Sequence, residues 1–235
     1  ESNYLNLPGL TGRREEVVLR NPSSQMFRSS VYHTGGVGVA QNVYGAVEIT
    51  QVEYPELSDL NTLSPDMIAV AESSLLTNIM QPFGRRYKPD SSISRFDLAT
   101  AFVRAGLVTQ YVAAKPMFTD ARDKFTRNAV ESVQSNPDGR LFYDAVNGGK
   151  FHPNSSATRV VAAVAFVKAA NLDSEAASTA LSSNVADIDS IPVEWRGYIA
   201  VALERGFISL DGNRVNPDRP LTRIELARAM SRLMM

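Results

Sequence analysis

The sequence repeats one pattern three times at a constant spacing. Residues 83–104, 147–168 and 211–232 align without a gap, and their glycines lie 64 residues apart (148−84 and 212−148). A period of this length predicts stacked copies of one supersecondary unit. A single copy would bury too little apolar surface to fold comfortably alone, so the three copies are expected to share one core.

Each copy predicts a glycine turn followed by a capped helix. The turn glycines lie in polar stretches and suit a positive φ: Gly84, Gly148 and Gly212. The residue expected to cap each helix is a Ser or Thr: Ser94, Thr158 and Thr222. Asp97 and Glu225 follow their caps by three residues and predict capping boxes, whereas Val161 breaks that pattern in the second copy.

A second helical stretch is expected before each turn, over residues 65–80, about 126–134 and about 194–205. Gly206 supplies a stop for the last of these. Residues 160–170 are apolar nearly all round, which predicts a helix buried on most sides. The expected fold is therefore mainly α: a pseudo-threefold bundle of three helix–loop–helix repeats, at 57–110, 116–172 and 185–235.

Residues 1–56 have a different pattern. Stretches rich in β-branched residues at 17–19, 37–40 and 43–52 predict about three strands, with a hairpin turn at Gly35-Gly36. This small β-rich segment is expected to pad the helical part or to be the tail of an upstream domain. Because the chain begins with Glu1, we expect it to be a fragment of a longer, exported protein.

The motifs of the three copies resemble the S-layer homology domain. Each copy opens with an apolar-x-Asp step that ends in Asp59, Asp120 or Asp187. The remaining matches are Tyr87-Lys88-Pro89-Asp90 with Ile93-Ser94-Arg95-Phe96-Asp97, Phe151-His152-Pro153-Asn154 with Thr158-Arg159, and Val215-Asn216-Pro217-Asp218 with Leu221-Thr222-Arg223-Ile224-Glu225. Trp195 resembles the family's Trp before the first helix of the unit, and the first two copies lack one. The resemblance covers residues 57–235.

This resemblance implies a non-catalytic module whose grooves hold cell-wall glycan, usually a wall polysaccharide that carries a pyruvate ketal. The arginine of the family motif, which contacts this glycan, corresponds to Arg95, Arg159 and Arg223. The expected glycan-binding residues are Arg95, Arg159, Arg223, Trp195, Asp59, Asp120, Asp187, Gly84, Gly148 and Gly212. The expected partner is cell-wall polysaccharide or a peptidoglycan-linked glycan, and the expected location is the bacterial cell surface after secretion.

The arginines also allow a structural interpretation. A cation at the first helical position opposes the helix dipole by roughly 0.3–1 kcal/mol, so its recurrence calls for an anionic partner. That partner is either an acidic sugar, bound through the guanidinium fork, or a neighbouring acid such as the Asp that opens each copy. Trp195 is likewise either a core or hinge anchor or a platform on which a sugar stacks.

Composition excludes several other classes of protein. Lys and Arg (24) nearly balance Asp and Glu (25), which argues against nucleic-acid binding. The chain has no Cys, which excludes disulfides, thiolate nucleophiles and cysteine-ligated metals. No apolar run is long enough to span a membrane, and no catalytic motif, metal site or cofactor site is expected. The alternative function is an accessory segment of a secreted hydrolase that controls its folding, oligomerisation or release.

Overall fold

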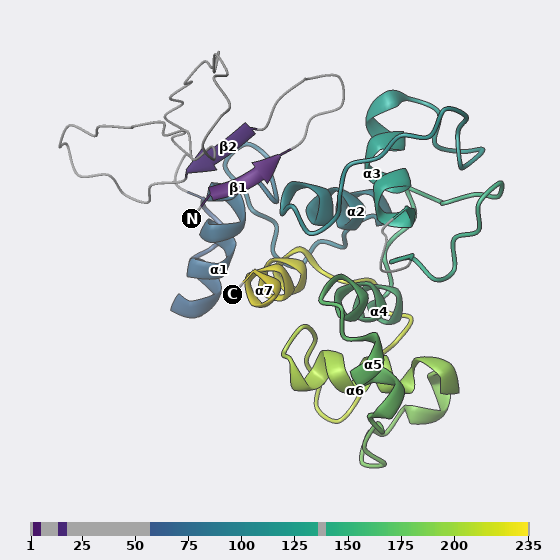
Figure 1. Cartoon of the computed structure of the whole chain (residues 1–235). Coiled ribbons are helices and arrows are strands. Elements are labelled where there is room, and N and C mark those ends of the chain that lie inside the picture. The colour runs from purple at the N-terminus through teal and green to yellow at the C-terminus, as the bar shows by residue number, and fades with distance from the viewer. Residues whose placement is uncertain (1, 6–13, 18–56, 136–139, 235) are drawn as a thin grey trace, which may run out of the picture.

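The computed structural model describes residues 2–5, 14–17, 57–135 and 140–234, and this part of the chain is mainly helical (Figure 1). Its helices are α1 (Pro65–Leu76), α2 (Arg95–Arg104), α3 (Lys124–Gln134), α4 (Arg159–Ala169), α5 (Asp173–Ser178), the 3-10 helix η1 (Ile188–Ser190), α6 (Val193–Glu204) and α7 (Arg223–Leu233). Strands β1 (Ser2–Leu5) and β2 (Arg14–Val17) pair antiparallel, with Ser2 opposite Val17. The strands expected at 37–40 and 43–52, and most of that at 17–19, lie outside the described residues.

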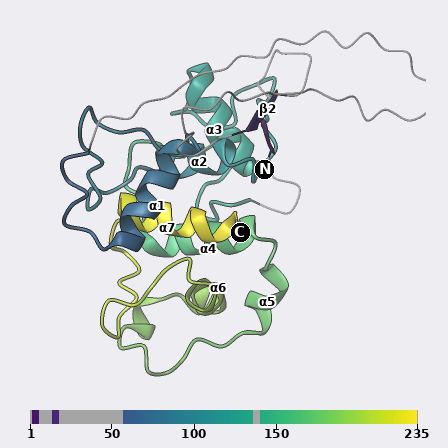
Figure 2. The same ribbon diagram turned by 90° about the vertical axis from the view of Figure 1, so that its left-hand side faces the viewer.

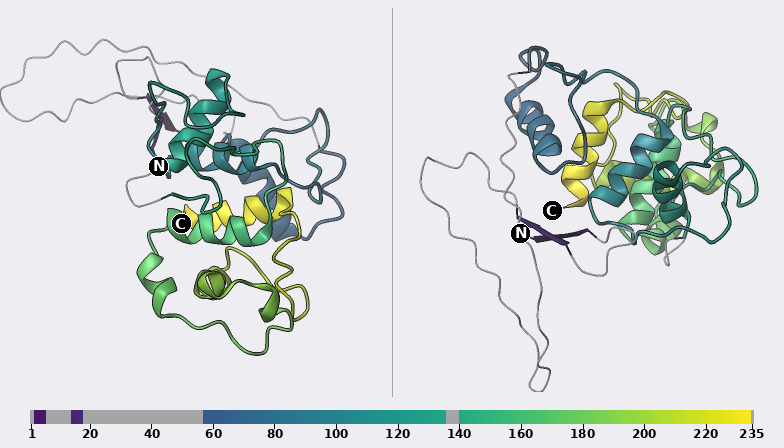
Figure 3. Two further views of the ribbon diagram at one scale, coloured as in Figure 1. Left: turned by 90° about the vertical axis from the view of Figure 1, so that its right-hand side faces the viewer. Right: turned by 90° about the horizontal axis from the view of Figure 1, so that it is seen from above.

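The helices pack in pairs that join different copies of the repeat. The capped helices α2, α4 and α7 lie around the centre, and α1, α3 and α6 lie outside them (Figures 1 and 3). The main pairs are α1 with α7, α3 with α2, and α6 with α4. Figure 2 shows α1 against α7 from a second side. The helix before each turn therefore packs mainly on a helix of another copy, and the first and last copies meet.

A ring of backbone hydrogen bonds joins the residues two positions before each capped helix. Ile93 N–H donates to Leu221 O at 3.0 Å, Leu221 N–H to Ala157 O at 2.8 Å, and Ala157 N–H to Ile93 O at 3.0 Å. All three side chains are buried. The positions lie 64 residues apart (157−93 and 221−157). The ring thus has the period of the sequence repeat.

Helix α4 lies deepest in the core, as its apolar sequence predicts. Every residue from Arg159 to Val167 is buried. Phe166 links α2 to the segment after α6, because its ring lies 5.8 Å from that of Phe102 and 6.2 Å from that of Phe207, centroid to centroid. A helix in contact with neighbours on all sides cannot be amphipathic, which explains its nearly uniform apolar composition.

The observed helix ends differ from the predicted ones at a few places. Helix α1 ends at Leu76 rather than at residue 80, because Asn78 takes a positive φ of 57°. The predicted stop at Gly206 is confirmed by its φ of 70°. The short helix α5 was not predicted. It packs closely on α6, where a Cβ atom added at Gly197 would lie 1.9 Å from Ala176 O.

The capping boxes form in the first and third copies only. The Ser94 hydroxyl accepts from Asp97 N–H, and the Asp97 carboxylate accepts from Ser94 N–H; Thr222 and Glu225 make the same exchange. Thr158 makes no side-chain cap hydrogen bond. Val161, which stands where the acid of the box would be, has no acceptor with which to complete the exchange.

We therefore expect unequal costs when these caps are replaced by Ala. Ser94→Ala and Thr222→Ala should each lower the free energy of unfolding by about 1 kcal/mol, because a helix N–H loses its acceptor. Thr158→Ala is the matched control and should cost clearly less. Urea denaturation of the three variants measures this, and equal losses at all three positions would contradict it.

Candidate functional site

The three repeated arginines are buried at the first position of their helices. Arg95, Arg159 and Arg223 begin α2, α4 and α7 and are only 6%, 1% and 8% exposed. Each Nε–H donates to a backbone carbonyl of the next copy in a cyclic order: Arg95 to Phe151 O at 2.8 Å, Arg159 to Val215 O at 2.6 Å, and Arg223 to Tyr87 O at 2.7 Å. The inner edge of each guanidinium therefore joins two copies.

The outer edges of the three guanidiniums have different partners. Arg95 donates from Nη1 and Nη2 to the two carboxylate oxygens of Asp144, at 2.8 and 3.0 Å. Arg159 donates from Nη1 to Glu225 and from Nη2 to Ser209 O. Arg223 is different.

The Nη2 of Arg223 donates to Gln81 O at 2.8 Å, and its Nη1 has no hydrogen-bond partner among the described residues. No carboxylate there lies within ion-pair distance of Arg223, whereas Arg95 and Arg159 each have one. Burial lowers the pKa of the Arg223 guanidinium. Arg223 is thus a buried cation whose outer nitrogen is available to an anion.

Substitutions between the copies explain these differences. Gln81, Ala145 and Ser209 are equivalent positions, 64 residues apart (145−81 and 209−145). The carbonyls of Gln81 and Ser209 accept hydrogen bonds from arginines, but the carbonyl of Ala145 accepts from Gln134 Nε2 at 2.9 Å. In the second copy the box acid is also missing, since Val161 stands there. The outer edge of Arg95 faces the loop residue Asp144 instead.

A cavity of about 230 Å³ lies at the contact between the first and third copies, and Arg223 lines it. Its other polar lining includes Asp97, Arg104 and Thr100, whose buried Oγ1 has no partner among the described residues. Asp97 is equivalent to Glu225 but is one methylene shorter, and its carboxylate accepts from Ser94 N–H at 2.9 Å. It completes its own capping box and leaves Arg223 unpaired.

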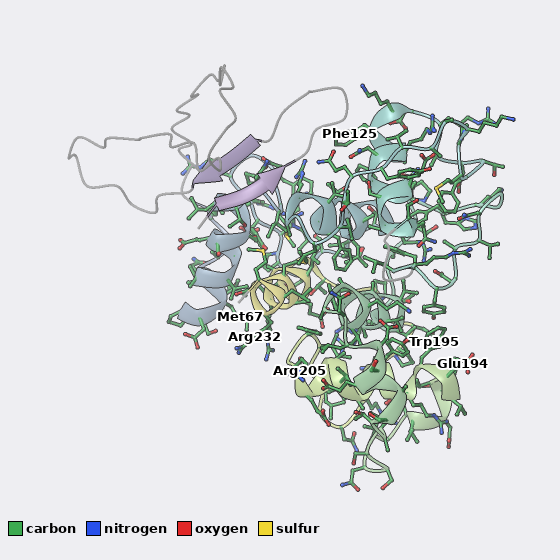
Figure 4. The ribbon with its side chains drawn as sticks, in the orientation of Figure 1. Met67, Phe125, Glu194, Trp195, Arg205 and Arg232 are labelled. Atoms are coloured by element: carbon green, nitrogen blue, oxygen red, sulfur yellow. The ribbon has the colours of Figure 1, made fainter. Side chains whose placement is uncertain are left out.

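Aromatic rings form the apolar side of this cavity. The exposed rings of Phe83 and Phe125 line it together with Phe96, and the centroids of the Phe96 and Phe125 rings lie 5.5 Å apart. Figure 4 labels Phe125. The Arg223 guanidinium carbon lies 4.7 Å from the centroid of the Phe83 ring. The cavity therefore offers two guanidiniums, a hydroxyl and apolar faces to a ligand, and its one carboxylate among the described residues, that of Asp97, is engaged in a capping box. This combination suits an acidic sugar with exposed C–H groups.

The opening aspartates bind backbone, not arginine. Each carboxylate accepts from two consecutive N–H groups of its own copy: Asp59 from Tyr87 and Lys88, Asp120 from Phe151 and His152, and Asp187 from Val215 and Asn216, at 2.7–2.9 Å. The second N–H of each pair belongs to a non-glycine residue with a φ of 51–58°. The alternative in which these aspartates pair with the arginines is wrong, because the carboxylates hold strained turns. Their contact with glycan stays a prediction.

Hydrogen bonding shifts the pKa values of these aspartates. Burial raises the pKa of each carboxyl, but the backbone N–H donors outweigh it and hold the pKa of Asp59, Asp120 and Asp187 below the ordinary value of 3.8. A carboxyl with a lowered folded-state pKa stabilises the fold above its unfolded-state pKa. That contribution is lost as the pH falls through the folded-state value.

The turn glycines lie at exposed tips. Gly84, Gly148 and Gly212 have φ values of 59°, 85° and 61°, as predicted, and a Cβ atom at any of them would meet nothing within 4 Å. Backbone conformation rather than space therefore requires glycine here. Glycan contact at these tips stays a prediction.

Trp195 links the second copy to α6. Its ring stacks on that of Tyr143, with centroids 4.1 Å apart and planes at 31°, and it lies 5.4 Å from the Tyr198 ring. Figure 4 places it at the start of α6. Burial, with the negative charge of Asp144 as the next contribution, raises the pKa of Tyr143 to about 12. This packing favours the anchor interpretation of Trp195, and its role as a sugar platform stays a prediction.

Sequence reasoning missed Asp144, Gln134 and the rings of Phe83 and Phe125. Asp144 and Gln134 have no counterpart in the repeated motif, so the repeat gave no signal for them. A comparison of equivalent positions could have indicated Phe83, since a large aromatic there replaces Asn147 and Asp211.

The described residues contain neither a metal-binding cluster of His, Cys, Asp and Glu nor a helix long and apolar enough to cross a membrane.

We expect Asp187→Asn to lower the free energy of unfolding at pH 7 by about 1–2 kcal/mol, because the amide is a weaker acceptor for the N–H groups of Val215 and Asn216. The difference from the unsubstituted chain should shrink as the pH falls below 3.8, where the wild-type carboxylate takes up a proton. Urea midpoints measured at several pH values test this. The control is Asp189→Asn, which changes a fully exposed carboxylate in a surface ion pair and should have little effect. A pH-independent difference for Asp187→Asn would contradict the expectation.

The comparisons with known proteins agree with part of the sequence interpretation. A search of curated proteins gives no match to the chain. The family model of the S-layer homology domain matches residues 186–227, a range that contains Asp187, α6, Gly212 and Arg223. Domains of this family are in general non-catalytic modules that anchor proteins to the cell wall, and they indicate association with the bacterial cell surface. Through its third copy, this chain is therefore similar to the S-layer homology family.

Proposed function

We propose that residues 57–234 form three S-layer homology repeats in a pseudo-threefold arrangement, and that they anchor a secreted protein to the cell envelope without a covalent bond. The family model supports the third repeat. The cyclic bonds of the arginines, the ring of backbone bonds through residues 93, 157 and 221, and the three aspartate contacts with turn N–H groups support the other two. The ligand is an acidic, pyruvylated cell-wall polysaccharide.

The observation that carries this proposal is the unpaired outer nitrogen of Arg223 in the cavity. A buried cation without a carboxylate partner is costly, and a ligand carboxylate would remove that cost. A guanidinium presents parallel N–H groups to a carboxylate, and hydrogen bonds between ionised partners are the stronger kind. The Phe83 ring beside Arg223 would cover the apolar side of the sugar.

The shape of the cavity restricts how such a ligand enters. Its aromatic rim at Phe83 and Phe125 is exposed, while Arg223 is buried. A sugar residue would therefore place its carboxylate inward and leave the chain of the polysaccharide outside. A terminal or branching acidic group suits this geometry better than a carboxylate within a straight polymer backbone.

The chain is proposed to have no catalytic activity. An accessory role within a secreted hydrolase remains the second candidate function. The extensive contacts between copies fit this role, since an accessory segment that controls folding would itself be a stable folding unit. Binding to isolated wall material separates the two functions, since an accessory segment needs no affinity for glycan.

We expect the chain to co-sediment with purified cell-wall sacculi, and to lose this binding after removal of the acidic polysaccharide. Arg223→Gln should weaken binding by about tenfold or more, because hydrogen bonds to an ionised partner contribute about 1.5–3 kcal/mol. Phe83→Ala should weaken it about threefold to tenfold while leaving the hydrogen bonds of Arg223 intact.

The control variant is Arg214→Gln, since Arg214 is an exposed arginine of the same copy that does not line the cavity. It should bind as the unsubstituted chain does. Thermal unfolding of each variant checks the fold, because Arg223 also holds Tyr87 O and Gln81 O. Unchanged binding by folded Arg223→Gln and Phe83→Ala would refute this site.

A further inference from the structure

Two of the three arginines already hold a carboxylate of this chain where an acidic ligand would bind. Asp144 meets the outer edge of Arg95 with both oxygens, the paired geometry that a guanidinium makes with any carboxylate. Glu225 meets Arg159 in the equivalent place. Of the three, only Arg223 has no described carboxylate within ion-pair distance, although Asp97 also lines its cavity.

The carboxylate of Glu225 is fixed by several further contacts. It accepts from Arg219 Nη2 at 2.5 Å, and from Thr222 N–H at 2.9 Å within the capping box. Arg159 is 1% exposed, so almost none of it can be reached from outside. A ligand would have to displace a helix cap and two cations together, which closes this position.

Among the described residues, the carboxylate of Asp144 accepts hydrogen bonds from Arg95 and from no other residue. Asp144 lies in the loop between α3 and α4, and its side chain is 39% exposed. The guanidinium of Arg95 remains anchored without it, because Nε–H donates to Phe151 O. Asp144 thus covers an arginine that is otherwise positioned like Arg223.

Aromatic rings flank the guanidinium of Arg95, as they do that of Arg223. Its guanidinium carbon lies 5.0 Å from the centroids of both Phe142 and Phe151, as that of Arg223 lies near Phe83 and Tyr87. Tyr143, next to Asp144 in the chain, stacks on Trp195. Phe142 and Phe151 are fully buried, whereas Phe83 is exposed, so these two rings hold the Arg95 guanidinium in place rather than offer a face to a sugar.

From these contacts we infer that Asp144 is a specificity-determining residue that keeps the Arg95 position closed to acidic glycans, so that the chain binds one acidic sugar, at Arg223. This inference rests on the proposed function. Removing the Asp144 carboxylate leaves Arg95 with an unpaired outer edge, and a ligand carboxylate takes its place. Asp144→Ala is therefore a gain-of-site substitution.

The probe is the methyl glycoside of a hexose carrying a pyruvate ketal, with the same glycoside lacking the ketal as the neutral control. NMR spectra of the full chain report the Nε–H signals of Arg95, Arg159 and Arg223 separately during titration. In the unsubstituted chain the ketal sugar should shift only the Arg223 signal. In Asp144→Ala it should shift both Arg223 and Arg95, and the bound stoichiometry should rise from one to two.

Two further variants complete the test. Arg223→Gln should bind no probe, and the double variant Asp144→Ala with Arg223→Gln should bind one molecule, at Arg95. Asp144→Asn keeps the shape of the side chain and replaces Asp144→Ala in the test if the latter unfolds. The probe should bind at Arg95 more weakly in Asp144→Asn than in Asp144→Ala. The signal of Arg159 should not move in any variant, and the neutral glycoside should shift no arginine signal.

The outcomes separate this inference from the proposed function. If the unsubstituted chain binds at Arg223 but folded Asp144→Ala and Asp144→Asn gain nothing at Arg95, the inference is overturned and the proposed function stands. If the unsubstituted chain already binds at Arg95, Asp144 does not close that position, and the inference also fails. If no variant binds the ketal sugar, the proposed function fails and the inference fails with it.

Discussion

The hydrogen bond from each arginine Nε–H to a carbonyl of the next copy is the contact on which the arrangement of the helices depends. Each arginine is a buried cation at the start of a helix, where the helix dipole opposes its charge. The guanidinium therefore needs hydrogen-bond acceptors from outside its own helix. Those acceptors come from a different copy each time. The unfavourable interaction of each cation with its own helix dipole is thus offset by hydrogen bonds that fix how the copies pack against one another.

The same residue can serve both architecture and recognition because a guanidinium has two edges. At Arg159 and Arg223, Nε and Nη2 donate to backbone carbonyls, and only Nη1 is left for a carboxylate. A lysine could not divide its roles in this way, since its ammonium is a point charge without fixed directions. Under the proposed function, single substitutions between the copies decide whether that carboxylate belongs to the chain or to a ligand.

Much of the fold could be predicted from the sequence because the repeat makes each local signal appear three times. The positive φ of the turn glycines, the boxes at Ser94 and Thr222 and the burial of α4 all follow from residues close together in the chain. The pairing of helices across copies could not be read in this way, because amphipathic patterns identify a buried face but not its partner. The site was only partly predictable for the same reason. The repeat identified the arginines, but Asp144 and Gln134, which decide what Arg95 contacts, lie at positions that the copies do not share.

The packing of α1 on α7 has a consequence for how the molecule forms. These helices are the first and the last that the structure describes, and α7 completes the surface on which α1 packs. Contacts of such long sequence separation carry a large loop-closure entropy and slow the folding of a domain. During synthesis, α1 would therefore stay without this partner until α7 is available, whereas α2 can pair with α3 much earlier. Loss of α7 should therefore release α1, although the two helices are far apart in the sequence.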